Sequence, residues 1–122
     1  MKKILVIEDD PLNREILSDY LGANGYEMVT AATGPEGLEC FHQTDPDLLL
    51  IDIQLPRKNG FEVCFEAKQS RDVPVLLMSA VYTDTEHAKP YAERGLKAEG
   101  YLVKPFGMAE LLAQVQSLIG QA

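Results

Sequence analysis

The stretch Leu48-Leu49-Leu50-Ile51-Asp52-Ile53 decides the fold. Its aliphatic residues form a continuous run, which is typical of a strand that is covered on both faces of a parallel sheet. Asp52 interrupts this run at a place where an unpaired charge would be costly. The stretch therefore predicts a buried central strand that ends in a carboxylate with a function.

Four further segments have the character of strands. Residues 4–7, 73–78 and 101–103 are short apolar runs like the first, and residues 26–30 alternate, which suits an edge strand. Helical patterns separate these runs, so strand and helix alternate five times along the chain. Such alternation predicts right-handed crossovers and a doubly wound α/β fold with a parallel five-stranded sheet and five helices.

Capping signals mark where the helices begin. Asp10-Pro11 offers a cap and a first-turn proline. Thr33 and Glu36 have the spacing of a capping box, and Asn59-Gly60 precedes a third helix. The apolar residues at helical spacing within these helices and the last one are Leu12, Ile16, Tyr20, Leu21; Leu38, Phe41; Phe61, Cys64, Phe65; and Met108, Leu111, Leu112, Val115, Leu118, Ile119.

The segment before the last strand predicts an irregular fourth helix. A second capping box begins at Thr83 and is followed by Lys89-Pro90. Because a proline disfavours helix at the residue before it, we expect the fourth helix to be short, broken or shifted.

Length and composition bound the class of protein. The 122 residues predict a single domain over 1–122, with a core of about 3–119 and no output domain in this chain. The net charge of −8 argues against direct nucleic-acid binding, which needs clustered Lys and Arg. No run approaches the ~20 apolar residues of a membrane span. Cys40 and Cys64 have no metal-ligand spacing, so we expect reduced cysteines in a cytoplasmic protein without membrane insertion.

Chemically active residues follow the predicted strands. Glu8-Asp9 comes after the first strand, Asp52 ends the third, Ser79 the fourth and Lys104 the fifth. Because ligands bind beyond the carboxyl ends of such strands, these side chains should meet. Carboxylates suit Mg²⁺, and an ammonium and a hydroxyl suit phosphoryl oxygens. Aspartate is an established nucleophile for acyl-phosphate formation.

This constellation resembles the receiver domain of response regulators in two-component signalling (CheY-like), over essentially the whole chain. The motifs that carry the resemblance are Glu8-Asp9, Asp52 with Pro56 and Gly60, Ser79-Ala80, and Tyr101-Leu-Val-Lys104-Pro105-Phe106. The resemblance implies the flavodoxin-like strand order 2-1-3-4-5. It also implies that the peptide before Pro105 is cis.

The same resemblance implies a metal site and a phosphorylation site. Asp52 is the expected phosphoacceptor. Asp9, Asp52 and the backbone carbonyl of Gln54 are the expected direct ligands of Mg²⁺ (or Mn²⁺), and Glu8 is expected to act through a metal-bound water. Val81 offers no polar atom to an attacking water, so we expect slow self-hydrolysis of the phosphoaspartate.

Signalling roles are implied in the same way. Ser79 and Lys104 are expected to contact the phosphoryl group, and Tyr101 to turn inward when Ser79 moves. The phosphoryl group is expected from a sensor histidine kinase or a phosphotransfer protein. A downstream partner is expected to read the surface of the fourth helix, fifth strand and fifth helix. Such a protein assists its own phosphorylation without being a turnover enzyme.

Other interpretations stay open at this point. The domain could bind partners without phosphate, although its acids, hydroxyl and lysine argue against that. An aspartate-nucleophile phosphatase needs a second acid two residues after the nucleophile, where this chain has Gln54, and a flavin site needs a hydroxyl- and glycine-rich loop after the first strand. Asp10 reads as a helix cap, Tyr101 could be an ordinary half-buried core aromatic, and His42 and His87 read as surface residues.

Overall fold

The computed structural model describes residues 1–79 and 98–122. The elements in chain order are β1 (Lys3–Ile7), α1 (Pro11–Ala23), β2 (Glu27–Ala31), α2 (Gly34–Thr44), β3 (Leu48–Asp52), α3 (Gly60–Ser70), β4 (Val75–Ser79), β5 (Gly100–Val103) and α5 (Met108–Ile119). All five expected strands are present, each within two residues of its predicted bounds. The described residues contain four helices. Five were predicted, and the fourth of them, which was expected to be short, broken or shifted, lies outside the described residues.

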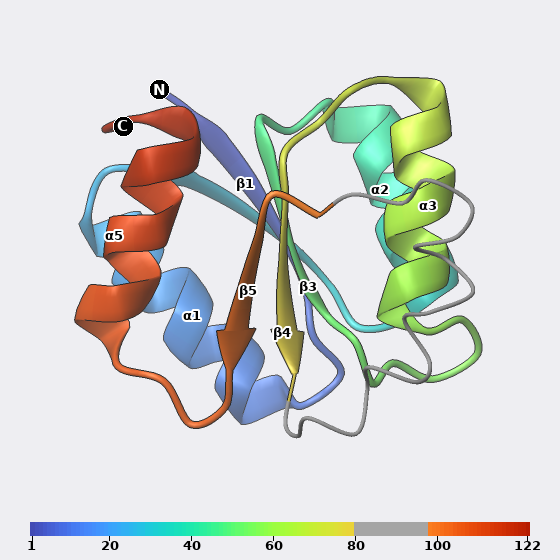
Figure 1. The fold of residues 1–122 in the computed structure, drawn as a ribbon, viewed down its shortest axis with the longest axis horizontal. Helices are drawn as coiled ribbons and strands as arrows, with labels where there is room; N and C mark the ends of the chain where they lie inside the picture. The colour runs from blue at the N-terminus through green and yellow to red at the C-terminus, as the bar shows by residue number, and fades with distance from the viewer. Residues whose placement is uncertain (80–97) are drawn as a thin grey trace.

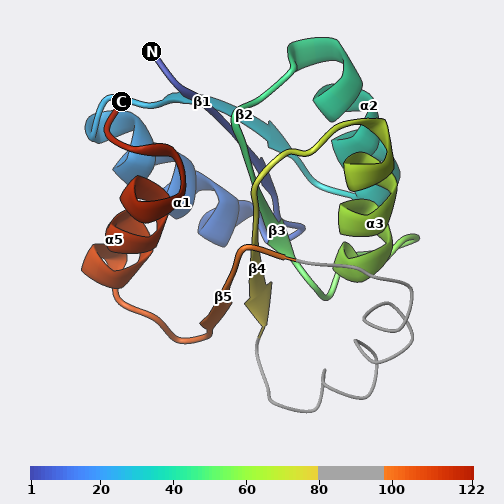
Figure 2. The ribbon, with the colours of Figure 1, turned by 45° about the horizontal axis from the view of Figure 1, so that its top comes forward.

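The strands form one parallel sheet in the order β2-β1-β3-β4-β5, which confirms the predicted topology (Figures 1 and 2). The chain leaves β1 for one edge of the sheet and later returns to β3 on the other side of β1. The switch point therefore lies between β1 and β3, where a doubly wound sheet opens a crevice at its carboxyl edge.

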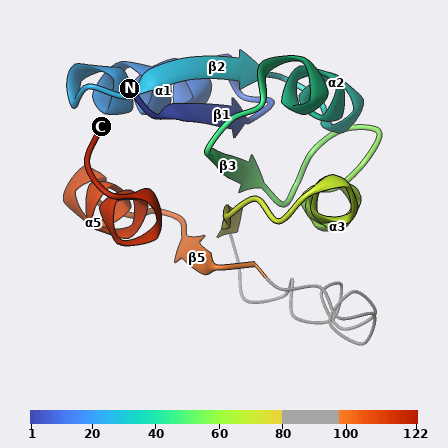
Figure 3. The same ribbon diagram turned by 90° about the horizontal axis from the view of Figure 1, so that it is seen from above.

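Helices cover both faces of the sheet, with α1 and α5 on one face and α2 and α3 on the other (Figure 3). Successive strand residues point to opposite faces, so each buried strand contributes side chains to two hydrophobic cores. The core under α1 and α5 contains Ile4, Val6, Leu48, Leu50, Leu76, Met78, Leu17, Leu21, Leu111 and Val115. The core under α2 and α3 contains Leu5, Ile7, Leu49, Ile51, Val75, Leu77, Phe41, Phe61, Val63, Cys64 and Ala67.

The predicted caps fix the helix starts. Asp10 accepts a hydrogen bond from the Leu12 backbone N at 3.0 Å, and Thr33 Oγ1 accepts one from Glu36 N at 3.2 Å. Asn59 caps α3 by accepting from Glu62 N at 3.0 Å. Each bond satisfies a backbone donor that has no partner within the helix.

No helix in the described ranges is long and apolar enough to cross a membrane.

The inner face of α1 differs from the prediction. Leu12 and Ile16 are 63% and 43% exposed, whereas Leu17, which the predicted stripe omitted, is buried with Leu21. The pair Leu17 and Leu21 lies four residues apart and faces the sheet, and Ile16 is turned about 100° away from Leu17 around the helix. Two apolar side chains are thereby left on the surface beside the carboxyl edge of the sheet.

Both chain termini lie at the amino ends of the strands, away from the arrowheads of β4 and β5 (Figures 1 and 2). Lys2 Nζ donates to Ile119 O at 2.6 Å, and the Tyr26 hydroxyl donates to Gly120 O at 2.6 Å. These bonds join the end of α5 to the start of the chain and to the residue before β2. Cys40 and Cys64 form no disulfide, His42 is exposed, and His87 lies outside the described residues.

Candidate functional site

Glu8 is the first residue after β1, and only 1% of its surface is exposed. Its Oε2 accepts a hydrogen bond from Lys104 Nζ at 3.0 Å, and its Oε1 accepts one from the backbone N of Asp10 at 3.2 Å. A carboxylate held in this way is fixed in direction, because both of its oxygens are engaged.

Asp52 is the last residue of β3 and is 5% exposed. Its Oδ2 accepts from Lys104 Nζ at 2.7 Å, and its Oδ1 accepts from Gln54 N at 2.9 Å. Gly60 donates its backbone N–H to Ile53 O at 2.8 Å. A Cβ on Gly60 would lie 2.5 Å from Asp52 O, so glycine is required where α3 begins against this strand end.

Lys104 follows β5 and joins the two buried acids. Its backbone N donates to Ser79 O at 2.7 Å, and the Lys104–Pro105 peptide is cis, as the resemblance implied. Burial works to lower the pKa of Lys104, but the hydrogen bonds and charges of Asp52 and Glu8 outweigh it, so the pKa is raised. The ammonium therefore stays charged between its two partners.

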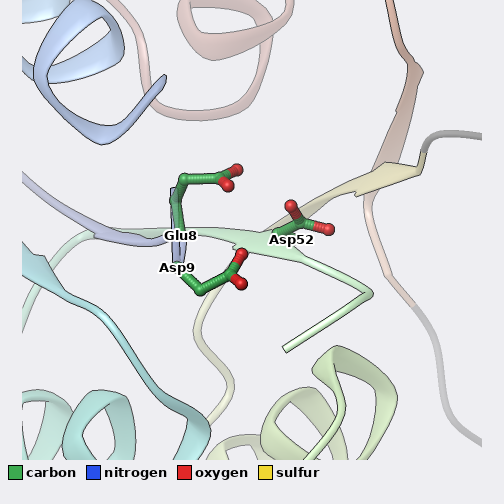
Figure 4. Close-up of side chains that lie close together, drawn as sticks. All are labelled: Glu8, Asp9 and Asp52. Atoms are coloured by element: carbon green, nitrogen blue, oxygen red, sulfur yellow. The ribbon is translucent and has the colours of Figure 1, made fainter. Parts of the chain in front are cut away.

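Asp9 completes the cluster from the exposed side. Figure 4 shows the carboxylates of Glu8, Asp9 and Asp52 gathered between the ends of β1 and β3. One oxygen of each lies within 4.8 Å of the others. Among the described residues, no other group of three His, Cys, Asp or Glu side chains comes together in this way.

Burial and the neighbouring Asp52 change the protonation of Glu8. The pKa of Glu8 is raised from its ordinary value of 4.5 to about 7: burial raises it most, the hydrogen bond and charge of Asp52 raise it as well, and Lys104 opposes both. Lys104 is the only cationic side chain in the described part of the chain that contacts these carboxylates. The cluster therefore holds more negative charge than its own cation can neutralise.

Residues 4–116 match the family model of the response regulator receiver domain. This chain is a response regulator receiver domain. Curated relatives agree: it is 38% identical to a probable transcriptional regulator ycf27 of Cyanophora paradoxa and 34% identical to response regulator RR06 of Streptococcus pneumoniae. The alignments cover 97% and 95% of this chain but 48% and 52% of those proteins. The receiver domain thus spans about half the length of these curated relatives.

Solved receiver-domain structures superpose closely on this one. The response regulator TrrA of Thermotoga maritima, in complex with Mg²⁺-BeF, matches with a TM-score of 0.85 and 35% identity over 97% of this chain and 99% of that one. The BeF₃-activated N-terminal receiver domain of RstA from Klebsiella pneumoniae matches with a TM-score of 0.86 and 31% identity over 98% and 100%.

The donor set of this receiver domain fits a divalent cation. Hard oxygen ligands suit Mg²⁺, which binds through one or two carboxylates and retains waters. Asp9 and Asp52 present such oxygens within 4.8 Å of one another, and among the described residues the three acids outnumber the one ammonium that contacts them, a surplus of negative charge that a dication would relieve.

The remaining predicted residues lie around the cluster. Ser79 ends β4 and is 8% exposed, one position beyond Met78, which pairs with Asp52 in the sheet register. Gln54 is exposed, and its backbone N bonds Asp52. Tyr101 is 52% exposed on β5 and belongs to neither of the two buried cores. The roles assigned to these residues stay predictions, and Val81 lies outside the described residues.

Two features of this site were not predicted from the sequence. Arg14 Nη1 donates to Glu8 O at 2.9 Å, from one turn into α1. A groove of about 440 Å³ runs beside the cluster and is lined by Glu8, Asn13, Ile16, Leu17, Lys104, Pro105, Phe106 and Met108. The position of Arg14 soon after the two acids was the available signal for the first feature. The groove depends on three segments meeting in space, which no local pattern encodes.

Proposed function

We propose that this receiver domain is a phosphoacceptor switch that takes a phosphoryl group onto Asp52 with the help of Mg²⁺. The observation that carries the proposal is the buried carboxylate of Asp52, held by Lys104 Nζ at 2.7 Å beside two further acids. In this proposal the phosphodonor is a phosphohistidine on a sensor histidine kinase or a phosphotransfer protein.

The transfer is a substitution at phosphorus. An Asp52 carboxylate oxygen forms the new P–O bond, the P–N bond of the phosphohistidine breaks, and its electron pair stays on the imidazole nitrogen. Lys104 lies within reach of the same carboxylate and can follow the phosphoryl oxygens as their negative charge reaches Asp52. Ser79, at the end of the next strand, supplies a hydroxyl donor to the phosphoryl group.

The proposed ligands of the cation are Asp9, Asp52 and the backbone carbonyl of Gln54, with Glu8 acting through a water. When bound, Mg²⁺ (or Mn²⁺) neutralises charge on the phosphoryl oxygens during transfer. Glu8 suits a role through water because Lys104 and the Asp10 backbone N–H already occupy its two oxygens.

We assign the docking of the protein phosphodonor to the exposed apolar side of α1. Leu12 and Ile16 are exposed there, and Ile16 lines the groove that also contains Glu8 and Lys104. An exposed apolar patch that is continuous with a polar site marks an interaction surface. Ile16→Ser should therefore slow transfer from the cognate phosphodonor and leave phosphorylation by acetyl phosphate unchanged. Equal slowing with both donors would contradict this assignment.

The output is proposed to pass through Tyr101 to the surface of β5 and α5 and the segment before them. Tyr101 is 52% exposed and can bury area by turning inward, which would change the face that a downstream partner meets. The proposal describes a switch that is reactive toward phosphodonors without being a turnover enzyme.

Intact-mass analysis after treatment with acetyl phosphate and Mg²⁺ tests the proposed function. The native chain should gain the mass of one phosphoryl group, and the gain should vanish in Asp52→Asn and after chelation of Mg²⁺. Asp47→Asn is a matched control, because Asp47 also accepts a backbone N–H, from Lys3 at 2.8 Å, at the opposite end of the sheet. A gain that persists in Asp52→Asn would overturn the assignment of the phosphoacceptor.

A further inference from the structure

The backbone carbonyl of Glu8 has an unusual partner. It lies just beyond β1, whose ladder with its neighbours ends at Ile7. Among the described residues no backbone N–H donates to this carbonyl, and Arg14 supplies the donor instead, with Nη1 at 2.9 Å from Glu8 O. The Arg14 side chain reaches back from α1 to make this bond and is partly buried.

This bond restrains a peptide group that both acids share. The carbonyl of Glu8 and the N–H of Asp9 belong to one planar unit, so they turn together. The orientation of that unit sets the direction in which each neighbouring side chain leaves the backbone. In the observed orientation Glu8 is buried against Lys104, whereas Asp9 is exposed and faces Asp52 from the other side (Figure 4).

We propose that Arg14 is a positioning residue for the cation: by holding the Glu8–Asp9 peptide it aims the two adjacent carboxylates at the place where Mg²⁺ binds. The inference rests on the proposed function for the identity of the ligand. It concerns a residue outside the motifs that suggested the metal site. Arg14 acts through the backbone and contacts neither the cation nor the phosphoryl group.

Charge and geometry make opposite predictions for this arginine. Through charge alone, a guanidinium beside an acidic cluster repels a cation, so its removal should tighten Mg²⁺ binding. Through positioning, its removal frees the Glu8–Asp9 peptide and should weaken binding, since groups that orient metal ligands typically contribute about tenfold or more to affinity. A purely structural role would lower stability and leave the affinity unchanged.

The test compares Mg²⁺ dissociation constants of the folded chain, measured by calorimetric titration. Arg14→Met keeps the long apolar stem and removes the donors, and it should weaken Mg²⁺ binding about tenfold. Arg14→Lys keeps one donor group and the charge, and it should recover part of the loss. Arg71→Met is the matched control, because Arg71 also donates to a backbone carbonyl, that of Pro46, far from the site. Its Mg²⁺ affinity should equal that of the native chain.

A second readout needs no cation. Without metal, the amide resonance of Asp9 should move in Arg14→Met and stay in place in Arg71→Met, because only the first variant releases the Glu8–Asp9 peptide. Equal or tighter Mg²⁺ binding by Arg14→Met, or an unmoved Asp9 amide, would overturn the inference. If the native chain binds Mg²⁺ but gains no phosphoryl group, the proposed function would be contradicted and the role of Arg14 would stand. A native chain that binds no Mg²⁺ would contradict both the proposed function and the positioning role of Arg14.

Discussion

Charged side chains are arranged differently at the two ends of the sheet. At the amino ends of the strands, ions meet in pairs near solvent: Lys3 Nζ lies 3.5 Å from Glu27, and Arg71 Nε lies 2.8 Å from Asp45. At the carboxyl ends, three carboxylates gather, and the two buried ones, Glu8 and Asp52, share the ammonium of Lys104, the one cation that contacts the cluster among the described residues.

The difference distinguishes charged residues that form ordinary surface ion pairs from charged residues that form a ligand-binding site. Exposed pairs cost little to form and contribute little to stability. Buried acids in excess of their cations lower stability, and a fold retains such a surplus at a site that binds something positive. The comparison therefore identifies the carboxyl end as the functional end, and variants at each end test this distinction.

The largest effect is expected for Lys104→Met. This change leaves Glu8 and Asp52 buried without their shared cation, so the free energy of unfolding at about pH 8 should fall by about 3 kcal/mol. The loss should shrink toward about pH 6, because Glu8 can then take up a proton and shed its charge. Denaturant unfolding at the two pH values measures both. A loss of less than about 1 kcal/mol would show that the ammonium is no more important than a surface ion.

A smaller effect of opposite sign is expected for Glu8→Gln. Folded Glu8 keeps its proton up to a pH of about 7, whereas unfolded Glu8 releases it near 4.5. Its contribution to stability is therefore fully present below about pH 4.5 and, when no metal is bound, is lost as the pH rises through about 7. Glu8→Gln should be more stable than the native chain at about pH 8, and the gap should close toward about pH 5. Parallel pH profiles for the two proteins would contradict the raised pKa.

The smallest effect is expected at the amino end. Lys3→Met removes the ion pair with Glu27, whose side chain is 50% exposed, and a hydrogen bond to Thr44 O, and it should lower the free energy of unfolding by about 1 kcal/mol. Mg²⁺ affinity should not change. A loss as large as that of Lys104→Met would erase the distinction between the two ends.

The sequence predicted the sheet because its signals are local. The apolar runs such as Leu48–Ile51 are continuous, and parallel strands bring their carboxyl ends together by geometry, so the meeting of Glu8, Asp9, Asp52 and Lys104 could be expected. The inner face of α1 was misjudged because Leu12 and Ile16 share a helical spacing with residues that do pack. Only the direction in which the helix sits on the sheet selects Leu17 over Ile16.

Other properties of the site depend on distances that no sequence pattern contains. The sharing of Lys104 between two acids follows from its position on β5 relative to the ends of β1 and β3. The raised pKa of Glu8 follows from the burial of its side chain and from the neighbouring Asp52. The bond from Arg14 to a backbone carbonyl depends on how the chain enters α1, and its one trace in the sequence is an arginine soon after the two acids, because the acceptor carbonyl occurs at every position.

The most direct test of the central claim is the effect of Mg²⁺ on thermal unfolding at about pH 8, compared between the native chain and Asp9→Asn. Asp9 is exposed, so its replacement should leave the metal-free fold intact while removing one proposed ligand. The account predicts that Mg²⁺ raises the unfolding midpoint of the native chain and that Asp9→Asn loses most of this rise. A native midpoint that does not respond to Mg²⁺, or an equal rise in Asp9→Asn, would contradict it.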